Sequence, residues 1–272
     1  MALNRSNKYP GRFLAPTAAR PQGAFKNRTS PTAQDGSYLE ADWANDWDGF
    51  FARILTVAGV TPNGNVDSGT ASQLYDALLS AMPGRLIGTR VFTNSGTYTP
   101  SPGAKKIRVY VTAAGGAGGG SLSTSNPRGG GGGAGGTAIK FITLSQAAYP
   151  VTVGVGSSIA ATGGASAFGS ECSASGGGHG TANAGAAGGL ATGGDINIQG
   201  GQGSDGAVNS NAGGGSGDGG SSYWGGGRRS STGVDGSAAG AYGAGGGGNQ
   251  ANSGSGGEAA GQNGIVYIEE YS

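Results

Sequence analysis

The fold of this chain depends on the stretch GGGGGAGG at residues 129–136, which contains the longest of several glycine runs. These runs lie between about residue 87 and residue 272, a region that holds all but eight of the 63 glycines. From residue 200 to residue 264 the only sizeable apolar side chains are Val208, Tyr223, Trp224, Val234 and Tyr242. Apolar surface this sparse cannot form a core of side chains, so the glycine backbone itself must account for the fold.

A region so rich in glycine can be disordered, collagen-like or a bundle of polyglycine II helices. Disorder is favoured by the large conformational entropy that glycine loses on folding. Collagen is excluded because the strict Gly-X-Y period is absent and proline is scarce. Polyglycine II helices have three residues per turn and no internal hydrogen bonds, so neighbouring helices can bond to each other where glycine recurs every third residue. That spacing occurs at Gly185/Gly188, Gly203/Gly206, Gly233/Gly236, Gly240/Gly243, Gly254/Gly257 and Gly261/Gly264.

Strand patterns frame the glycine-rich region. Residues Lys106–Thr112 alternate Ile107, Val109 and Val111 with polar or aromatic residues, as a half-buried strand does. A final strand has to return and pair with the first ones, so the pattern favours an ordered domain over disorder. The other predicted strands are Arg90–Thr93, Thr137–Leu144, Pro150–Val155, Ile265–Ile268 and, more weakly, Asp195–Ile198.

Residues 39–86 are predicted to form a short helical segment. One apolar helix face is formed by Leu39, Trp43, Trp47, Phe50, Ile54 and Val57. Ser37 and Glu40 fit a capping box at its start, and Gly59 fits its end. A second helix follows Asp67 or Ser68 and ends at Pro83-Gly84. Two short helices cannot close a core alone, so we expect an oligomer held by Trp43, Trp47, Phe50, Ile54, Leu74 and Leu78.

Residues 1–38 read as an extended arm, because prolines 10, 16, 21 and 31 break any helix. The arm is either a disordered tail or a peptide that lies in a groove on a partner. For the second alternative, Tyr9, Phe13 and Phe25 are the expected anchors. Residues 1–34 also carry six Lys and Arg and no acid, which could pair with acidic groups on that partner.

Composition argues against enzymatic, metal and nucleic-acid functions. The formal net charge is only +1, so we do not expect nucleic-acid binding. Asn63, Asn65 and Asp67 alternate like calcium ligands, but the EF-hand pattern then needs glycine at 68 and glutamate at 74, where this chain has Ser68 and Leu74. Residues 201–206 match a dinucleotide fingerprint, yet no helix-forming segment follows. We therefore expect that the protein is not an enzyme and that it binds no cofactor and no metal. Cys172 is expected to be buried. Neither a membrane span nor a secretory signal is apparent.

Several motifs in residues 4–82 resemble the N-terminal segment of tail-fibre proteins of tailed bacteriophages and prophages. They are Asn7–Phe13, Arg20–Asn27, Asp42–Phe51 and Gly59–Gly64. Residues 87–272, which contain Gly96–Pro100 near their start and Gly264–Tyr271 near their end, look like the glycine-rich domains of phage fibre tips. In composition they are similar to the polyglycine II host-recognition domain of T-even-like tip adhesins.

The resemblance implies a virion protein, made in the host cytoplasm and assembled as a homotrimer. Residues 1–38 would attach it to a phage tail or baseplate protein, residues 39–86 would oligomerise, and residues 87–272 would bind a bacterial outer-membrane protein or lipopolysaccharide. The expected fold is mixed, with an extended arm, a short α-helical segment and a β-strand-framed glycine-rich domain. One alternative is a structural tail adaptor or joint that carries a separate adhesin. Another is an extracellular glycine-rich structural protein, which suits the glycines but not the arm or the helices.

Receptor contacts are expected where large side chains interrupt the glycine runs. Binding residues concentrate on loops held by a rigid frame, and Trp, Tyr and Arg dominate interface hot spots. Trp224 could stack on a sugar or an aromatic group while Arg228 and Arg229 pair with a phosphate or carboxylate. Alternatively, Trp224 fills a gap against the strands or a trimer partner. The candidate residues are Arg128, His179, Tyr223, Trp224, Arg228, Arg229 and Tyr242.

Overall fold

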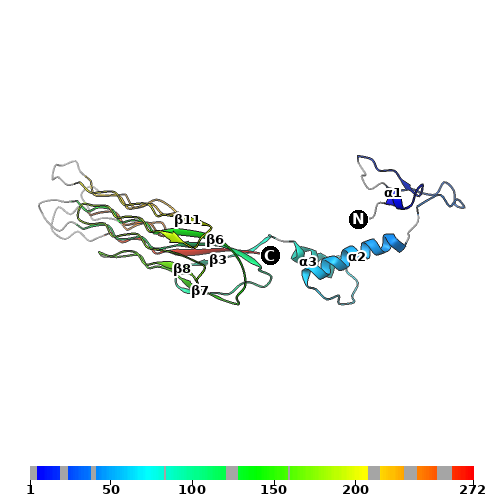
Figure 1. Cartoon of the computed structure of the whole chain (residues 1–272), viewed down its shortest axis with the longest axis horizontal. Helices are drawn as coiled ribbons and strands as arrows, with labels where there is room; N and C mark the ends of the chain where they lie inside the picture. Colours follow the sequence, from blue (N-terminus) through cyan, green and yellow to red (C-terminus); the bar gives the residue numbers. More distant parts are fainter. Residues whose placement is uncertain are drawn as a thin grey trace. The chain divides into compact units, whose positions relative to one another are not determined.

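The chain folds into two compact units, residues Met1–Pro83 and Gly84–Ser272 (Figure 1). The structure, a computed structural model, describes residues 5–18, 24–37, 41–82, 84–120, 128–158, 160–207, 215–229, 238–249 and 259–272. The predicted positions of Leu39, Glu40 and Pro83, and the glycine pairs 233/236 and 254/257, lie outside these residues. Each unit is considered by itself below.

In the first unit, the arm has more local structure than its prolines suggest. A short helix, α1 (Arg5–Lys8), precedes two strands, β1 (Phe13–Leu14) and β2 (Ala24–Phe25), which pair antiparallel. The ring of Phe13 lies 5.2 Å from that of Phe25 and 6.1 Å from that of Tyr9. Phe13 is only 8% exposed, so it packs within the arm itself, whereas Phe25 is half exposed.

The predicted capping box of Ser37 and Glu40 at the first long helix includes residue 40, which lies outside the described residues. Helix α2 runs from Ala41 to Ala58, and Gly59 ends it with a positive φ of 69°, as predicted. The Ser37 hydroxyl, however, donates to the carbonyl of Arg12 and accepts from the backbone N–H of Lys26. Ser37 therefore links the segments around Arg12 and Lys26 within the arm.

Helix α3 begins later than the sequence predicts, at Gln73, and ends at Ala81. Ser72 is its N-cap and accepts from the N–H of Tyr75. The Asp67 carboxylate accepts from the Ser72 hydroxyl and from the first two helical N–H groups, and these hydrogen bonds lower its pKa. Asp67 thus supports the helix start from six residues away in sequence. Of the helices in the described residues, none has the length and apolar character to cross a membrane.

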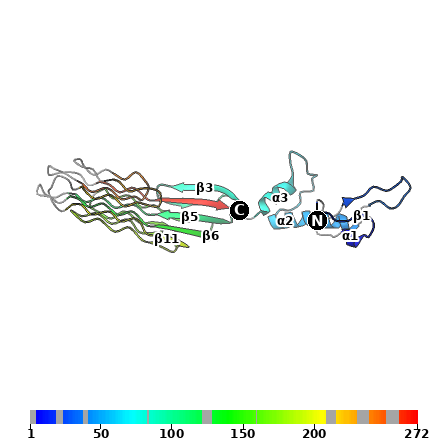
Figure 2. The ribbon, with the colours of Figure 1, turned by 90° about the horizontal axis from the view of Figure 1, so that it is seen from above.

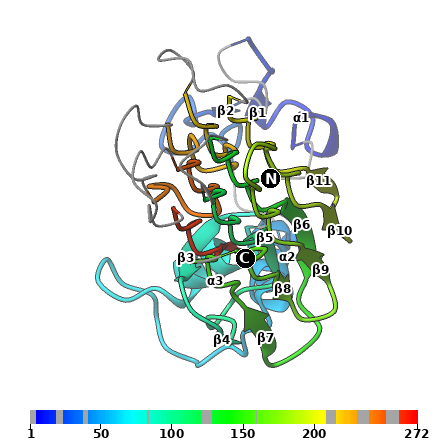
Figure 3. The same cartoon turned by 90° about the vertical axis from the view of Figure 1, so that its left-hand side faces the viewer.

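The second unit contains two five-stranded antiparallel sheets packed face to face (Figure 3). The first sheet has the order β11-β6-β5-β12-β3, and the second has β10-β9-β8-β7-β4. The strands are β3 (Leu86–Phe92), β4 (Gly96–Tyr98), β5 (Lys106–Thr112), β6 (Thr137–Thr143), β7 (Tyr149–Thr152), β8 (Ser166–Phe168), β9 (Cys172–Ala174), β10 (Ala191–Thr192), β11 (Ile196–Ile198) and β12 (Ile265–Tyr271).

The predicted closing strand is confirmed, because β12 pairs with both β3 and β5. All six predicted strands are present; Lys106–Thr112 has the predicted ends, and the other five have shifted ends. Strands β4, β8, β9 and β10 were not predicted. The core between the sheets contains Ile107, Val109 and Val111 of β5, as predicted, with Tyr98, Tyr149, Phe168 and Cys172 from the opposite sheet. Cys172 is buried, as the sequence indicated.

Beyond the strands, extended glycine-rich segments lie side by side (Figures 1 and 2). The central one is the stretch 129–136. Its N–H groups donate in turn to the carbonyl groups of three neighbouring segments. Residues 129, 132 and 135 donate to residues 249, 246 and 243, and residues 130, 133 and 136 donate to residues 181, 178 and 175. Residues 131 and 134 donate to residues 204 and 201. The N···O distances of these eight bonds are 2.8–3.1 Å.

The carbonyl groups of the same stretch follow the same rule toward three further neighbours. Those of residues 130, 133 and 136 accept from 119, 116 and 113; those of 131 and 134 accept from 186 and 189; those of 129 and 132 accept from 217 and 220. In the part of the chain that the structure describes, the stretch is therefore surrounded by six bonded segments. Successive residues face different neighbours with a period of three.

This packing explains why glycine is required. A Cβ added at Gly131, Gly132 or Gly133 would lie within 3.0 Å of a carbonyl group on a neighbouring segment. The frame is thus built from backbone groups, and its hydrogen bonds replace the side-chain contacts of an ordinary core.

The second unit contains a buried carboxylate on its last strand. Glu270 of β12 is 1% exposed and accepts hydrogen bonds from the Tyr98 hydroxyl at 2.8 Å and from the N–H and hydroxyl of Ser101 at 3.1 and 2.7 Å. The missing side chain of Gly88, opposite on β3, leaves room for it. Burial alone would raise the pKa of Glu270, but the hydrogen bonds, with help from Arg90, hold the pKa below its usual value.

We expect Glu270→Gln to destabilise the second unit by about 2 kcal/mol at pH 7, since hydrogen bonds to a charged acceptor are lost. A carboxylate with a lowered folded pKa stabilises the fold above its unfolded pKa and loses that effect as pH falls. The difference from wild type should therefore shrink toward pH 3, as calorimetric melting at pH 7 and pH 3 would show. Glu269→Gln, on the outer face, is the control and should cost under about 1 kcal/mol. Equal losses for both variants at pH 7 would contradict the role of Glu270.

Candidate functional site

The outer face of the first sheet carries rows of large side chains. Tyr110 of β5 lies opposite Tyr267 of β12 and Ile139 of β6, and Arg108 lies opposite Glu269 and Phe141. Side chains alternate between the faces of a strand, and the intervening residues of β5 point into the core. These rows therefore face away from the core.

A short turn places two more aromatic residues over this face. Ser222 and Gly225 form a bridge, and the Ser222 hydroxyl donates to the carbonyl of Tyr242 at 2.6 Å and accepts from the N–H of Trp224 at 3.2 Å. The turn between them presents Tyr223 and Trp224. Their rings lie 6.1 and 6.2 Å from that of Tyr110.

The indole of Trp224 is held in place by the strand beneath it. Its Nε1–H donates to Oγ1 of Thr112 at 2.8 Å, and its ring lies edge-on to those of Tyr223 at 5.2 Å and Tyr267 at 6.1 Å. Trp224 remains 36% exposed and Tyr223 47% exposed. We call Tyr110, Tyr223, Trp224 and Tyr267 the aromatic platform.

A charged pair borders the platform. The Arg108 guanidinium lies 3.6 Å from the Glu269 carboxylate and 5.6 Å from the ring centre of Phe141. The Tyr271 hydroxyl donates to the same carboxylate at 2.9 Å. Burial and this hydrogen bond raise the pKa of Tyr271.

Beside the platform lies a shallow groove of about 440 Å³. Tyr110, Ile139 and Phe141 of adjacent strands line it, together with Tyr223 from the turn. Arg108, Asp195 and Ile196 complete the lining. The groove thus combines apolar rings with one basic and one acidic side chain, which suits a small amphipathic group.

The structure brings together only part of the predicted receptor-binding set. Tyr223 and Trp224 are adjacent to each other and to Tyr242, whose carbonyl holds their turn. Arg228 and Arg229 are exposed farther along the chain, where the backbone of Arg228 bonds Gly219 and Gly245. Among the described residues, no contact joins either guanidinium to Trp224. Trp224 also packs against the strands, which was the alternative to receptor contact.

His179 and Arg128 lie elsewhere, within the glycine-rich segments. His179 is half-buried between Gly178 and Gly180, whose backbones bond residues 133 and 117. Arg128 is buried where the central stretch begins, and its N–H donates to the carbonyl of Ala207. Neither residue contributes to the platform.

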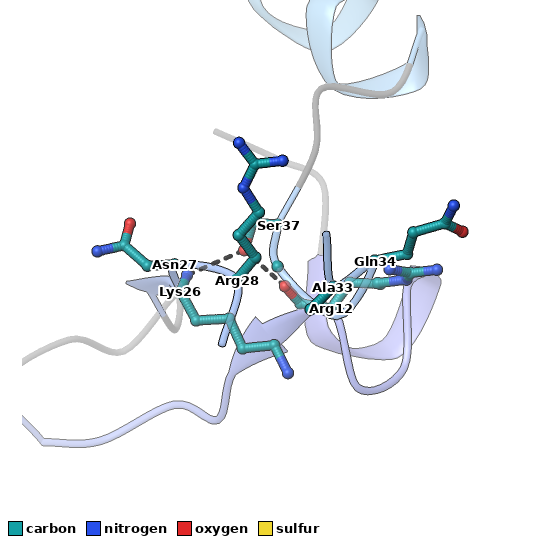
Figure 4. A pocket seen from close by; sticks show the side chains of 8 residues that line it. Arg12, Lys26, Asn27, Arg28, Ala33, Gln34 and Ser37 are labelled. Carbon is teal, nitrogen blue, oxygen red and sulfur yellow. Dashed lines mark hydrogen bonds between the residues drawn. The ribbon is translucent and has the colours of Figure 1, made fainter. Parts of the chain in front are cut away.

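In the arm, basic residues line a separate pocket (Figure 4). Arg12, Lys26 and Arg28 are among its lining residues, and Ser37 joins two of them through the hydrogen bonds described above. Their charged ends point in different directions rather than toward one spot. The pocket therefore offers no focused anion site.

The predicted oligomerisation residues lie on helices with little internal burial. No residue of α2 is buried within the single chain. Phe50 is 54% and Leu78 41% exposed. The rings of Trp43 and Trp47 meet edge-on at 6.0 Å, and Trp43 also contacts Phe25. Ile54 and Leu74 are half-buried. The apolar surface of this helix pair is thus largely uncovered in one chain.

Several residues of the site could not be predicted as a group. Arg108, Tyr110, Phe141, Tyr267 and Glu269 come from three strands and meet only through strand register. The alternation within Lys106–Thr112 did place Arg108 and Tyr110 on one face, and this was the available signal. In the described residues, no group of three His, Cys, Asp or Glu side chains could hold a metal ion.

Comparison with known families gives one match. Residues 91–271 match a family described as a glycine-rich domain. No curated protein matches the chain. The matched range starts within β3 and ends at the last residue of β12, so it includes the whole second sheet and, apart from residues 86–90 of β3, the first.

Proposed function

Since the chain belongs to the glycine-rich domain family, we propose that it is a tail-fibre protein of a tailed bacteriophage or prophage, whose glycine-rich part recognises a receptor on the host surface. The observation that carries this proposal is the aromatic platform, an exposed cluster of Tyr and Trp on a rigid frame. Exposed aromatic clusters of this kind are typical of binding surfaces. The receptor in this proposal is an outer-membrane protein or lipopolysaccharide.

The proposal includes polyglycine II helices as the material of the frame. Such a helix turns once in three residues and directs its N–H and C=O groups outward. The period of three in the hydrogen bonds of residues 129–136, and the six neighbours around them, are what supports this conformation. A frame of this kind holds a binding surface in place without a large side-chain core.

The proposal also assigns the first unit to assembly. Three chains would cover the exposed apolar surface of α2 and α3, which supports a homotrimer. Residues 1–38 would then attach the fibre to a tail or baseplate protein through Tyr9, Phe25 and the basic side chains, with the whole assembly in the virion. Three copies of a weak receptor site gain avidity from being linked.

We expect the purified full-length chain to block phage adsorption to host cells, with Tyr223→Ala/Trp224→Ala reducing the block at least tenfold. Arg228→Ala/Arg229→Ala should have a small effect, because those side chains lie apart from the platform. Tyr242→Ala is the control, because Tyr242 is similarly exposed, its ring is not part of the platform, and alanine keeps the carbonyl that holds the turn. Adsorption counts over a range of competitor concentrations measure the effect.

A wild-type chain that binds no host cells and leaves adsorption unchanged would contradict receptor recognition. That result would favour a structural adaptor that carries a separate adhesin. If Arg228→Ala/Arg229→Ala reduces the block of adsorption as much as Tyr223→Ala/Trp224→Ala does, the binding site is not confined to the platform.

A further inference from the structure

We propose that the groove beside the aromatic platform binds a neutral, hydroxyl-rich saccharide. This inference rests on the proposed function, because it names the class of surface ligand that the site takes. The proposed function leaves the receptor as an outer-membrane protein or lipopolysaccharide, and this inference states that the group bound is a saccharide.

Aromatic rings line the groove. Tyr110 and Phe141 come from neighbouring strands, and Tyr223 stands on the turn above them. The faces of aromatic rings carry partial negative charge, which attracts the weakly positive C–H groups on one side of a sugar ring. Because Tyr110 contacts Tyr223 and Tyr267, its orientation is fixed before any ligand arrives.

Polar groups at the border of the groove fit the hydroxyl groups of a sugar. Asp195 uses one carboxylate oxygen to accept from the N–H of Phe141 at 2.8 Å, and its other oxygen can accept from a ligand. Arg108 supplies N–H donors at the same groove. A hydroxyl group both donates and accepts, so it can satisfy both partners, whereas a purely apolar ligand would leave them unpaired.

The charge balance disfavours an anionic ligand. Arg108 is already paired with Glu269, and Asp195 adds a second negative charge at the groove. Arg228 and Arg229, which could have paired with phosphate groups, contact no residue of the platform in the described part of the chain. A phosphorylated or carboxylated saccharide would therefore meet net negative charge.

The test uses the full-length chain on an array of defined neutral, phosphorylated and carboxylated oligosaccharides, followed by titration of the best neutral binder. We expect binding to neutral members, a loss of about tenfold or more with Tyr223→Ala, and no change with Tyr242→Ala. Tyr242 is the matched control because it is similarly exposed but does not line the groove. Asp195→Asn should weaken binding less than tenfold, since an amide oxygen still accepts.

Tight binding to phosphorylated or carboxylated members alone, binding to none, or equal effects of Tyr223→Ala and Tyr242→Ala would overturn the inference. A parallel assay separates it from the proposed function. Periodate treatment of host cells, which destroys sugar diols, should abolish binding of the chain, and protease treatment should not. If protease treatment abolishes cell binding and periodate treatment does not, receptor recognition is supported and the saccharide inference is refuted.

Discussion

Gly132→Ala is expected to unfold the second unit at temperatures where the wild-type chain is stable. An added Cβ would lie within 3.0 Å of carbonyl groups of Gly116 and Ala117 on the neighbouring segment. Relief requires the two segments to separate, which breaks the bonds that the N–H groups of Gly116 and Gly119 donate to the carbonyl groups of Gly133 and Gly130. Overpacking costs typically 1–3 kcal/mol, and each lost hydrogen bond about 1 kcal/mol. We expect a loss of about 3 kcal/mol or more.

The control for this experiment is another glycine in the same unit. An added Cβ at Gly226 would meet nothing within 4 Å, and its φ is not positive. Gly226→Ala should change stability by less than about 1 kcal/mol and can raise it, because alanine restricts the unfolded chain. Thermal unfolding followed by circular dichroism measures both variants. Similar melting temperatures for the two would contradict a frame of closely packed backbone.

Phe50→Gln/Leu78→Gln is expected to convert the proposed trimer into monomers. Both side chains are largely exposed in one chain, so the helices should keep their structure. Burying a large apolar side chain in an interface contributes about 1.5–3 kcal/mol, and the change is repeated in each of the three chains. Glutamine is also a good helix former, so helix propensity is nearly unchanged.

Sedimentation velocity at micromolar concentration measures this effect. Val66→Gln is the control, because Val66 is fully exposed outside the helices, and it should leave the assembly intact. A wild-type chain that sediments as a monomer would refute the trimer. A double variant that stays trimeric would place the interface on another surface.

Prediction from sequence succeeded where one strand carries its own signal. Alternation along Lys106–Thr112 and the strand-like run Ile265–Ile268 were enough to place β5 and β12, and a final strand was expected to return and pair with the first ones. Strands β8, β9 and β10 have two or three residues each. Strands this short form because neighbouring strands bond to them, and two or three residues are too few to show an alternating pattern.

The candidate site shows the same limit. Tyr223 and Trp224 stood out because large side chains are rare among the glycines. Closeness in sequence groups Arg228 and Arg229 with them, yet residues four apart in an extended segment are separated by about 12 Å. Arg108 and Asp195 reach the groove through register and turns, which sequence spacing does not reveal.

The backbone frame also has a consequence for how stability varies with temperature. Unfolding a typical domain exposes mainly apolar surface, which raises the heat capacity, whereas exposure of peptide groups lowers it. The segments around residues 129–136 would expose mostly peptide groups. Their unfolding should therefore carry a small heat-capacity change, which flattens the stability curve and keeps this part of the protein folded over an unusually wide range of temperature.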